Sequence, residues 1–249
     1  MKKFISAILC ALLFVGFVLP VTAQGIVRVN PDVLTMEHFR YRQADLLVDE
    51  GKYAEAAIAF GKLGDYSDAR QRSFELWKTV PNRRTISFDT AATDYGYMFC
   101  ALRKDGPVAV DAQESTRVPQ SFIENYYTVK FKDIVSLYPY VGLKMDGTLV
   151  LAEDVKLEHG EELARWTDIV QIEVGDFYII GVKIDGTVVG TGLGDKGLQY
   201  VADWTDIIAV SSKFGHAVGL KKDGSLVFAG SNGKGQCNTA GWPKILLPQ

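Results

Sequence analysis

Cysteine and histidine are scarce in this chain, with three of each among 249 residues. Cys10 lies in an apolar N-terminal segment, so only Cys100 and Cys237 remain for the rest of the chain, too few for a disulfide framework. The histidines, His38, His159 and His216, stand far apart with no second ligand-type residue at metal spacing. We therefore expect no metal site and a fold held together by packed apolar surface.

An excess of basic charge is also lacking. The chain has 27 Lys and Arg against 30 Asp and Glu, and two of the lysines, Lys2 and Lys3, precede the apolar N-terminal segment. A nucleic-acid partner normally requires a basic face that releases counterions from the phosphates. Arg83-Arg84 is the tightest arginine pair, and we interpret it as part of a solvated linker. We expect no nucleic-acid partner.

The N-terminus has the pattern of an export signal. Lys2 and Lys3 are followed by apolar residues 4–19 and then by small residues ending at Ala23. This run is shorter than the ~20 residues that cross a bilayer, so a retained anchor is the weaker interpretation. Cys10 lies within the run rather than at its end, which argues against a lipoprotein. We predict a signal peptide at 1–23, a linker at 24–34, and a secreted or cell-envelope protein with no stable membrane span.

Residues 35–80 have the spacing of helices. Apolar residues recur with helical periodicity, and Gly51 and Gly64 interrupt them, which predicts helices near 35–50, 53–63 and 67–79. Residues 41–69 resemble a tetratricopeptide unit through the following residues: Ala44, Leu47, Gly51, Tyr53, Ala56, Ala57 and Phe60. One such unit buries its apolar face poorly, so we expect it to lean on the following domain or on a partner. It serves either as a packing spacer or as a peptide-binding groove.

Four segments of residues 84–249 share an Asp-Gly pair between alternating or β-branched residues. The pairs begin at Asp105, Asp146, Asp185 and Asp223, and their glycines recur after 41, 39 and 38 residues. Asp-Gly suits a two-residue hairpin turn, and the aspartate can accept hydrogen bonds inside its own turn. Each segment therefore predicts a β-hairpin, and its aspartate has a structural explanation instead of an acid–base role.

A second marker precedes each of the later hairpins. It begins at Phe131, Trp166, Trp204 and Trp242, and the three tryptophans are 38 residues apart. A period of this length, with several strands and no helical pattern between them, is typical of a propeller or a β-solenoid. We predict a mainly β protein with a small α module: about three helices, then a short-repeat β-propeller of about four blades, open or incomplete.

The last complete unit, residues 210–237, resembles the regulator of chromosome condensation repeat in its short form from exported bacterial proteins. The resemblance rests on these residues: His216, Asp223-Gly224, Val227, Gly230, Asn232 and Gly235-Gln236. It extends over 84–249, which holds about four repeats, whereas the family commonly forms seven-bladed propellers. The resemblance thus implies a ring that is small, open, or completed by another copy. We expect residues 242–247 to close the ring by pairing with the first sheet near Ile86.

Catalytic motifs find no support in this sequence. The spaced glycines of 192–197 fit a dinucleotide-binding loop, but the equivalent loop at 230–235 also leads to a Trp-led strand and not to a helix, so we interpret both as turns. No nucleophile elbow is present, and His216 lacks an evident nucleophile beside it. We expect no enzyme activity and no cofactor.

Aromatic residues recur in the loops that enter the hairpins, and they are our candidate binding residues: Tyr95, Tyr97, Tyr138, Tyr140, Phe177, Tyr178, Phe214 and His216. At equivalent places they would form an arc that favours protein or glycan contacts, although half of them could be ordinary core. Relatives in the repeat family, a nucleotide-exchange factor and an exported β-lactamase inhibitor, act through protein surfaces. We predict an exported interaction or scaffold module; the alternatives are a cell-wall polymer hydrolase and a structural surface protein without a discrete ligand.

Overall fold

The computed structural model describes residues 35–84, 86–89, 98–102, 108–112, 131–138, 141–151, 160–175, 178–192, 198–213, 215–235, 237–239 and 242–247, with only the backbone for 86–89, 98–100 and 108–112. The predicted signal peptide and linker lie outside these residues. Residues Met36–Gln249 form one compact unit. None of the helices in the described part has the length and apolar character needed to cross a membrane.

The helical module consists of three helices, α2 (Met36–Asp49), α3 (Tyr53–Leu63) and α4 (Ala69–Trp77), which confirms the predicted arrangement. Gly51 and Gly64 follow α2 and α3 with φ angles of 74° and 56°, a conformation that glycine adopts without strain. Between the helices, Phe60 is fully buried and meets the ring of Tyr41 edge to face at 5.1 Å. The small residues of the tetratricopeptide-like pattern thus do allow close packing here.

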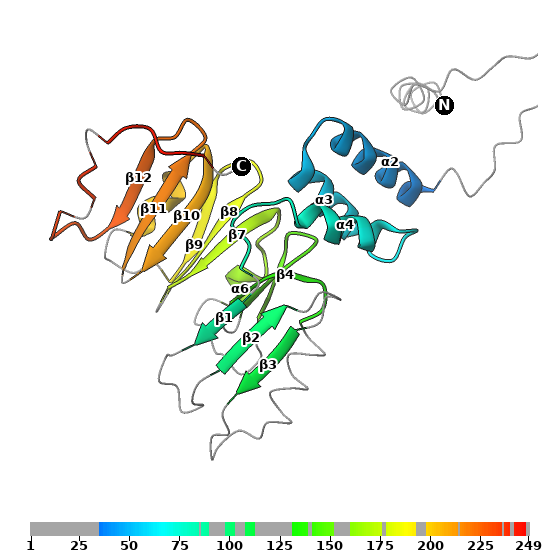
Figure 1. The fold of residues 1–249 in the computed structure, drawn as a ribbon, viewed down its shortest axis with the longest axis horizontal. Coiled ribbons are helices and arrows are strands. Elements are labelled where there is room, and N and C mark those ends of the chain that lie inside the picture. The colour runs from blue at the N-terminus through cyan, green and yellow to red at the C-terminus, as the bar shows by residue number, and fades with distance from the viewer. Residues whose placement is uncertain are drawn as a thin grey trace, which may run out of the picture. The chain divides into compact units, whose positions relative to one another are not determined.

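Four antiparallel three-stranded sheets follow (Figure 1). Their strands are β1 (Ile86–Asp89), β2 (Met98–Leu102) and β3 (Val108–Ala112); β4 (Ile134–Tyr138), β5 (Val141–Lys144) and β6 (Leu149–Leu151); β7 (Ile169–Val174), β8 (Ile179–Lys183) and β9 (Val188–Thr191); β10 (Ile207–Lys213), β11 (His216–Lys221) and β12 (Leu226–Gly230). We call them sheets 1 to 4. The protein is therefore mainly β with a small α module, as predicted. Short helical segments that the sequence did not predict, α6 (Gly160–Leu163) and η2 (Leu198–Asp203), precede two of the tryptophan markers.

The predicted hairpins form, but the predicted two-residue turn is wrong for the three described Asp-Gly loops. In sheet 2, Gly147 N donates to Lys144 O and Lys144 N donates to Thr148 O, which makes a three-residue loop. Only the glycine has positive φ (77°), whereas a two-residue type I′ turn needs it at both central residues. Sheets 3 and 4 repeat this geometry.

The aspartates of these loops accept hydrogen bonds within their own turn, as predicted. Asp146 Oδ1 accepts from Thr148 N at 3.0 Å and from its hydroxyl at 2.6 Å, and Asp185 and Asp223 have the same pair of contacts. Burial opposes ionisation of Asp146, yet these bonds and the charge of Lys144 lower its pKa. The fourth aspartate, Asp105, lies outside the described residues.

The markers at Trp166 and Trp204 link each sheet to the one before it through an Asp-Ile pair. Asp168 has φ 61°, its carbonyl accepts from Ile184 N in its own sheet, and the next residue, Ile169, donates its N–H to Gly147 O of the preceding hairpin. Asp133 and Asp206 share this left-handed conformation and the bond to their own sheet, and Ile207 repeats the bond to the preceding hairpin at Gly186. The recurring sequence pattern is therefore a backbone device that joins successive sheets.

The structure also reveals a marker for sheet 1, which the sequence did not. Ile86 of β1 pairs with Ala101 as Leu137 of β4 pairs with Gly142. Asn82 lies four residues before Ile86, as Asp133 lies four residues before Leu137, and Asn82 likewise has a positive φ of 61°. The first marker is thus Val80-Pro81-Asn82-Arg83. In it, Val80 replaces the aromatic residue and Arg83 replaces the buried isoleucine.

The core lies within and between the sheets. Each marker aromatic packs across the glycine of its own middle strand: a Cβ at Gly181 would lie 3.0 Å from the Trp166 ring, and one at Gly219 2.9 Å from Trp204. In sheets 2 and 3 the other face of the middle strand is covered by the following sheet. Ile180 and Val182 of sheet 3, for example, share a buried cluster with Val210 of sheet 4.

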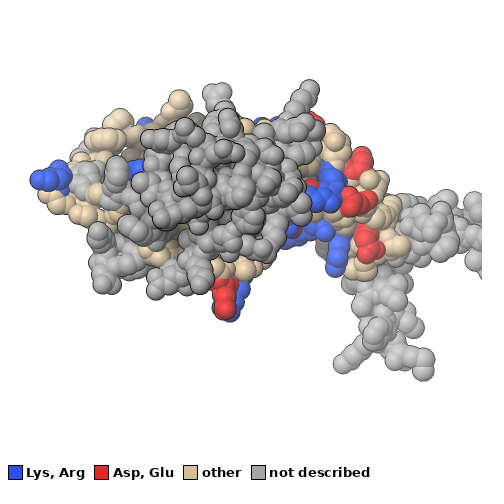
Figure 2. All heavy atoms as spheres, turned by 90° about the horizontal axis from the view of Figure 1, so that it is seen from below, with Lys and Arg blue, Asp and Glu red and all other residues tan. Residues whose placement is uncertain are grey.

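The helical module docks on sheet 2, which confirms that it leans on the sheet domain. Trp77 is fully buried and donates its indole N–H to Met145 O at 2.9 Å, and Gly61 of α3 lies against the same loop. The marker carboxylates face the helices, since Arg70 pairs with Asp133 and Lys62 pairs with Asp168 at 2.8 Å. Seen from below, the described part of the surface toward one end has basic and acidic side chains close together (Figure 2).

The expected closure by residues 242–247 is wrong. They contain no strand, and the described β1 pairs only with β2. Instead, Ile245 N donates to Gly224 O at 2.9 Å, the bond that Ile169 and Ile207 make to the hairpin before them. The segment is therefore a fifth marker, held by its own preceding hairpin and not by the first sheet.

Candidate functional site

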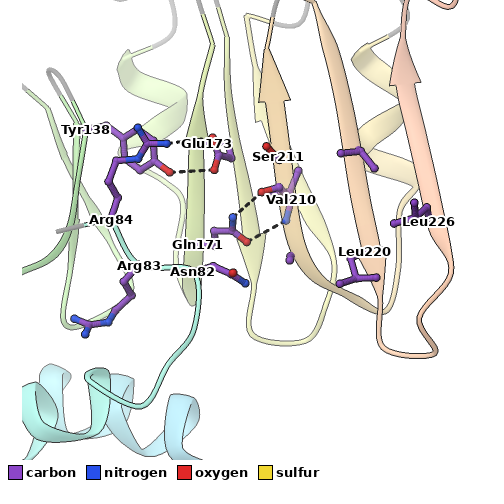
Figure 3. Close-up of a pocket in the computed structure, with 12 residues that line it drawn as sticks. Asn82, Arg83, Arg84, Tyr138, Gln171, Glu173, Val210, Ser211, Leu220 and Leu226 are labelled. Carbon is purple, nitrogen blue, oxygen red and sulfur yellow. Dashed lines mark hydrogen bonds and ion pairs between the residues drawn. The ribbon is translucent and has the colours of Figure 1, made fainter. Parts of the chain in front are cut away.

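A cleft of about 470 Å³ opens where the first marker meets sheets 2 to 4 (Figure 3). Its lining comes from residues 82–84, from the first strands of three sheets, and from β11 and β12: Asn82, Arg83, Arg84, Tyr138, Gln171, Glu173, Ala209, Val210, Ser211, Val218, Leu220 and Leu226. Arg84, Tyr138 and Glu173 lie together on one side, and Leu220 and Leu226 lie on the other. The cleft therefore has a polar wall, a floor and an apolar wall.

The polar wall is a connected cluster. The guanidinium of Arg84 lies 4.3 Å from the centre of the Tyr138 ring, and the Tyr138 hydroxyl donates to Glu173 at 3.2 Å. Burial raises the pKa of Glu173 and, with the nearby Glu173 charge, raises that of Tyr138. Arg84 Nη2 stands 4.0 Å from the Glu173 carboxylate and offsets part of its desolvation. Of the three, Arg84 is the accessible member, with 45% of its side chain exposed.

The floor is formed by bridges between first strands. Gln171 of β7 spans the gap to β10, since its amide donates to Val210 O at 2.7 Å and accepts from Val210 N at 3.0 Å (Figure 3). Asn82 donates to Ile208 O at 3.3 Å, which brings the first marker to sheet 4. On the other side, Leu137 N donates to Arg84 O at 2.7 Å. The described first strands and the first marker are thus linked around the cleft.

The apolar wall belongs to sheet 4 and interrupts the repeat pattern. Val218 corresponds to Val141 and Ile180 in sheets 2 and 3, which are at most 1% exposed because the next sheet covers them, and Leu220 likewise corresponds to two residues that are at most 1% exposed. Val218 and Leu220 are only partly buried. The described residues therefore leave this face of sheet 4 less covered than its counterparts.

Arg83 explains part of this opening. It occupies the position of Ile134, Ile169 and Ile207, each at most 2% exposed, but a long cation cannot fill an apolar interface in the same way. Its Nη1 donates to Val135 O at 3.2 Å, while its buried Nε has no hydrogen-bond partner among the described atoms. Burial lowers its pKa. The solvated linker we expected here is thus a half-buried element of the cleft.

Three of the eight predicted binding residues are described, and of these Tyr138 alone lines the cleft. Tyr138 and Tyr178 are 3% and 6% exposed, and His216 is partly buried. Tyr178 and His216 are equivalent, since each stands three residues before the glycine of its middle strand, whereas Tyr138 ends a first strand. The other five lie outside the described residues: Tyr95, Tyr97, Tyr140, Phe177 and Phe214. The arc stays a prediction.

The chemistry available in the described part is limited. Glu173 is the one carboxylate among the described residues that line the cleft, and no group of metal-ligating side chains occurs among those described. In the suspected dinucleotide loops, Gly192, Gly230 and Gly235 all have positive φ, and a Cβ at Gly230 would lie 2.1 Å from Gly215 O. Chain geometry therefore accounts for these glycines, although 193–197 lie outside the described residues.

Sequence reasoning missed Asn82, Arg83, Arg84, Gln171 and Glu173. A signal for the first three was present, since Pro81 and Pro243 occupy the same marker position. A scan against models of protein families finds no match, and a search of curated proteins finds no matching relative. The interpretation of the site therefore rests on its own geometry.

Proposed function

We propose that this chain is an exported, non-catalytic interaction or scaffold protein that binds a protein partner through the cleft and the adjoining face of sheet 4. The carrying observation is the partial exposure of Val218 and Leu220 at positions that sheets 2 and 3 bury completely. An apolar sheet face beside a polar rim is the composition of a protein interface. Accessible Arg84 supplies a charged contact at that rim.

The platform, in this proposal, is an incomplete short-repeat propeller of the regulator of chromosome condensation type. Four sheets with the same strand order support it, as does the marker bond that recurs in sheets 2 to 4. The bridges from Arg84 to β4 and from Gln171 to β10 support a common centre for the first strands. In such an arrangement the seam between the last and first sheets is the natural binding site, because its apolar surface lacks a covering sheet.

A polymer hydrolase is the less favoured alternative. Glycoside hydrolysis commonly uses two carboxylates facing each other across the scissile bond. The described cleft offers Glu173, whose oxygens already accept from Tyr138 and face Arg84. A glycan ligand is likewise less favoured, because one wall of the cleft consists of Val218, Leu220 and Leu226. A structural surface protein without a ligand is an outcome of the binding test below.

Export is part of the proposal and has its own test. Cleavage after Ala23 would leave Gln24 at the mature N-terminus. N-terminal sequencing of the native protein should find this start in an extracytoplasmic fraction. A cytosolic protein that retains Met1 would contradict the proposed localisation.

Affinity capture tests the binding site. The bait is the chain from Gln24, as wild type and as two leucine variants, Leu220→Asp in the cleft and Leu46→Asp on α2, where Leu46 is 47% exposed. We expect a partner from envelope extract to bind wild type and Leu46→Asp and to lose binding to Leu220→Asp. Loss with Leu46→Asp alone would move the site to the helical module, and no specific partner with any bait would favour the structural surface protein.

A further inference from the structure

We propose that the face of sheet 4 and the Trp242 marker together bind a second copy of this chain, which supplies its sheet 1 in a head-to-tail contact. This inference names the partner of the proposed interaction surface and therefore rests on the proposed function. It starts from a count: in the described residues, five markers accompany four sheets. One marker is thus without a sheet of its own.

Trp242 shows which marker that is. Trp166 and Trp204 are each 7% exposed because each lies over the glycine of its own middle strand, but Trp242 is 63% exposed. Its marker keeps the bond to the preceding hairpin, since Ile245 N donates to Gly224 O and Lys244 pairs with Asp223 at 2.6 Å, although Lys244 does not share the positive φ of Asn82 and the marker aspartates. The docking position is therefore formed, and what is lacking among the described residues is a sheet beneath the indole.

The face next to this marker matches the same missing element. Val218, Leu220, Leu226 and Phe228 lie on one side of sheet 4 by the register of β11 and β12, and all four are only partly buried. The equivalent side of sheet 3 is covered by sheet 4 through Val210 and Ala217. This face of sheet 4 is therefore complementary to another repeat sheet, which would cover it as sheet 4 covers sheet 3.

Sheet 1 is the repeat sheet that lacks an aromatic marker, because Val80 stands where the others have Phe or Trp and packs with Trp77 of the helical module. Its described strands β1 and β2 pack on β4. The middle strand carries Ala101, the smallest side chain after glycine, at the glycine position. A single chain contains both sheet 1 and the Trp242 marker, yet Trp242 is exposed in it. We therefore assign the contact to a neighbouring copy. Such a contact is heterologous and either closes into a ring or continues.

Sedimentation velocity and tryptophan fluorescence of the chain from Gln24 test this proposal. The other tryptophans, Trp77, Trp166 and Trp204, are buried, so fluorescence quenching by acrylamide reports on Trp242. With rising protein concentration we expect species of at least twice the monomer mass and a parallel loss of quenching. In Trp242→Phe, the concentration-dependent loss of quenching should disappear, even where that variant still associates.

Two variants separate the interface from folding. Trp242→Ala removes an exposed side chain, so the monomer should unfold like wild type, yet self-association should weaken about tenfold or more, as for a central interface tryptophan. Leu46→Asp should associate like wild type. A monomer at all concentrations with Trp242 quenched throughout overturns the self-association. If that monomer still captures an envelope protein through Leu220, the proposed function stands without this inference.

Discussion

Gly61→Ala distinguishes a docked helical module from an independent one by the sign of its effect. Gly61 lies in α3, and a Cβ built on it would be 2.4 Å from Met145 O and 2.6 Å from Met145 C. These are backbone atoms of the loop in sheet 2, which cannot move aside as a flexible side chain could. Were the module independent of the sheets, alanine would stabilise α3 by about 1 kcal/mol relative to glycine.

The docked structure predicts the opposite result. Relief of the overlap has to move α3 away from the loop, at a cost of about 1–3 kcal/mol for overpacking. It also strains the bond from Trp77 to Met145 O, which contributes about 1 kcal/mol. After the gain in helix propensity is subtracted, we expect a net loss of about 1–3 kcal/mol in the free energy of unfolding.

Urea unfolding followed by tryptophan fluorescence and by circular dichroism measures this change. Gly160→Ala is the matched control, because Gly160 begins a short helix and its added Cβ would meet only Leu151 Cδ1 at 3.7 Å. The control should stay within about 0.5 kcal/mol of wild type. A Gly61→Ala protein as stable as wild type, or more stable, would refute the docking of α3 on sheet 2.

Three further changes test the sheets. Gln171→Met should destabilise by about 2 kcal/mol in urea unfolding, because it leaves the N–H and C=O of Val210 unpaired in a buried place; an unchanged midpoint would show that the bridge is unimportant. The pKa of Asp146 is lowered in the folded protein, so Asp146→Asn should lower the free energy of unfolding by about 1 kcal/mol at neutral pH. This difference from wild type should shrink as the pH falls below ~4, where the aspartate takes up a proton in both the folded and the unfolded protein. A difference that does not depend on pH would contradict this. Cys237 is a free thiol, and replacing Cys100 and Cys237 with serine should leave the melting temperature nearly unchanged under oxidising conditions, whereas a large drop would show a disulfide between them.

Local patterns predicted most of the described architecture. Helix periodicity broken by Gly51 and Gly64 predicted three helices close to their observed bounds, because glycine ends a helix wherever tertiary contacts allow. The repeated Asp-Gly pairs predicted the hairpins, but not the loop length, which depends on which of the two residues takes positive φ. Side-chain identity alone does not decide that choice.

The candidate site was less predictable, because it arises where the repeat breaks down. Aromatic residues drew attention as a recurring feature, yet Tyr138 and Tyr178 are buried by neighbours that their own repeat does not specify. The first marker escaped notice because Val80 and Arg83 replace the aromatic residue and the isoleucine that define the others. Its conformation survives in Asn82, whose positive φ only the backbone reveals.

The departures from the repeat also explain how one face of sheet 4 stays available. In sheets 2 and 3 the face is closed by an isoleucine that follows the marker aspartate, namely Ile169 and Ile207, and by the sheet it introduces. At the corresponding places around the cleft stand Arg83, whose charge resists full burial and whose Nη1 reaches Val135 O of sheet 2, and Ile245, which makes the marker bond to Gly224 without a described sheet behind it. Because Ile245 already holds the carbonyl of Gly224, a sheet that covers this face would dock under the Trp242 marker, and we expect removal of residues 242–249 to weaken self-association.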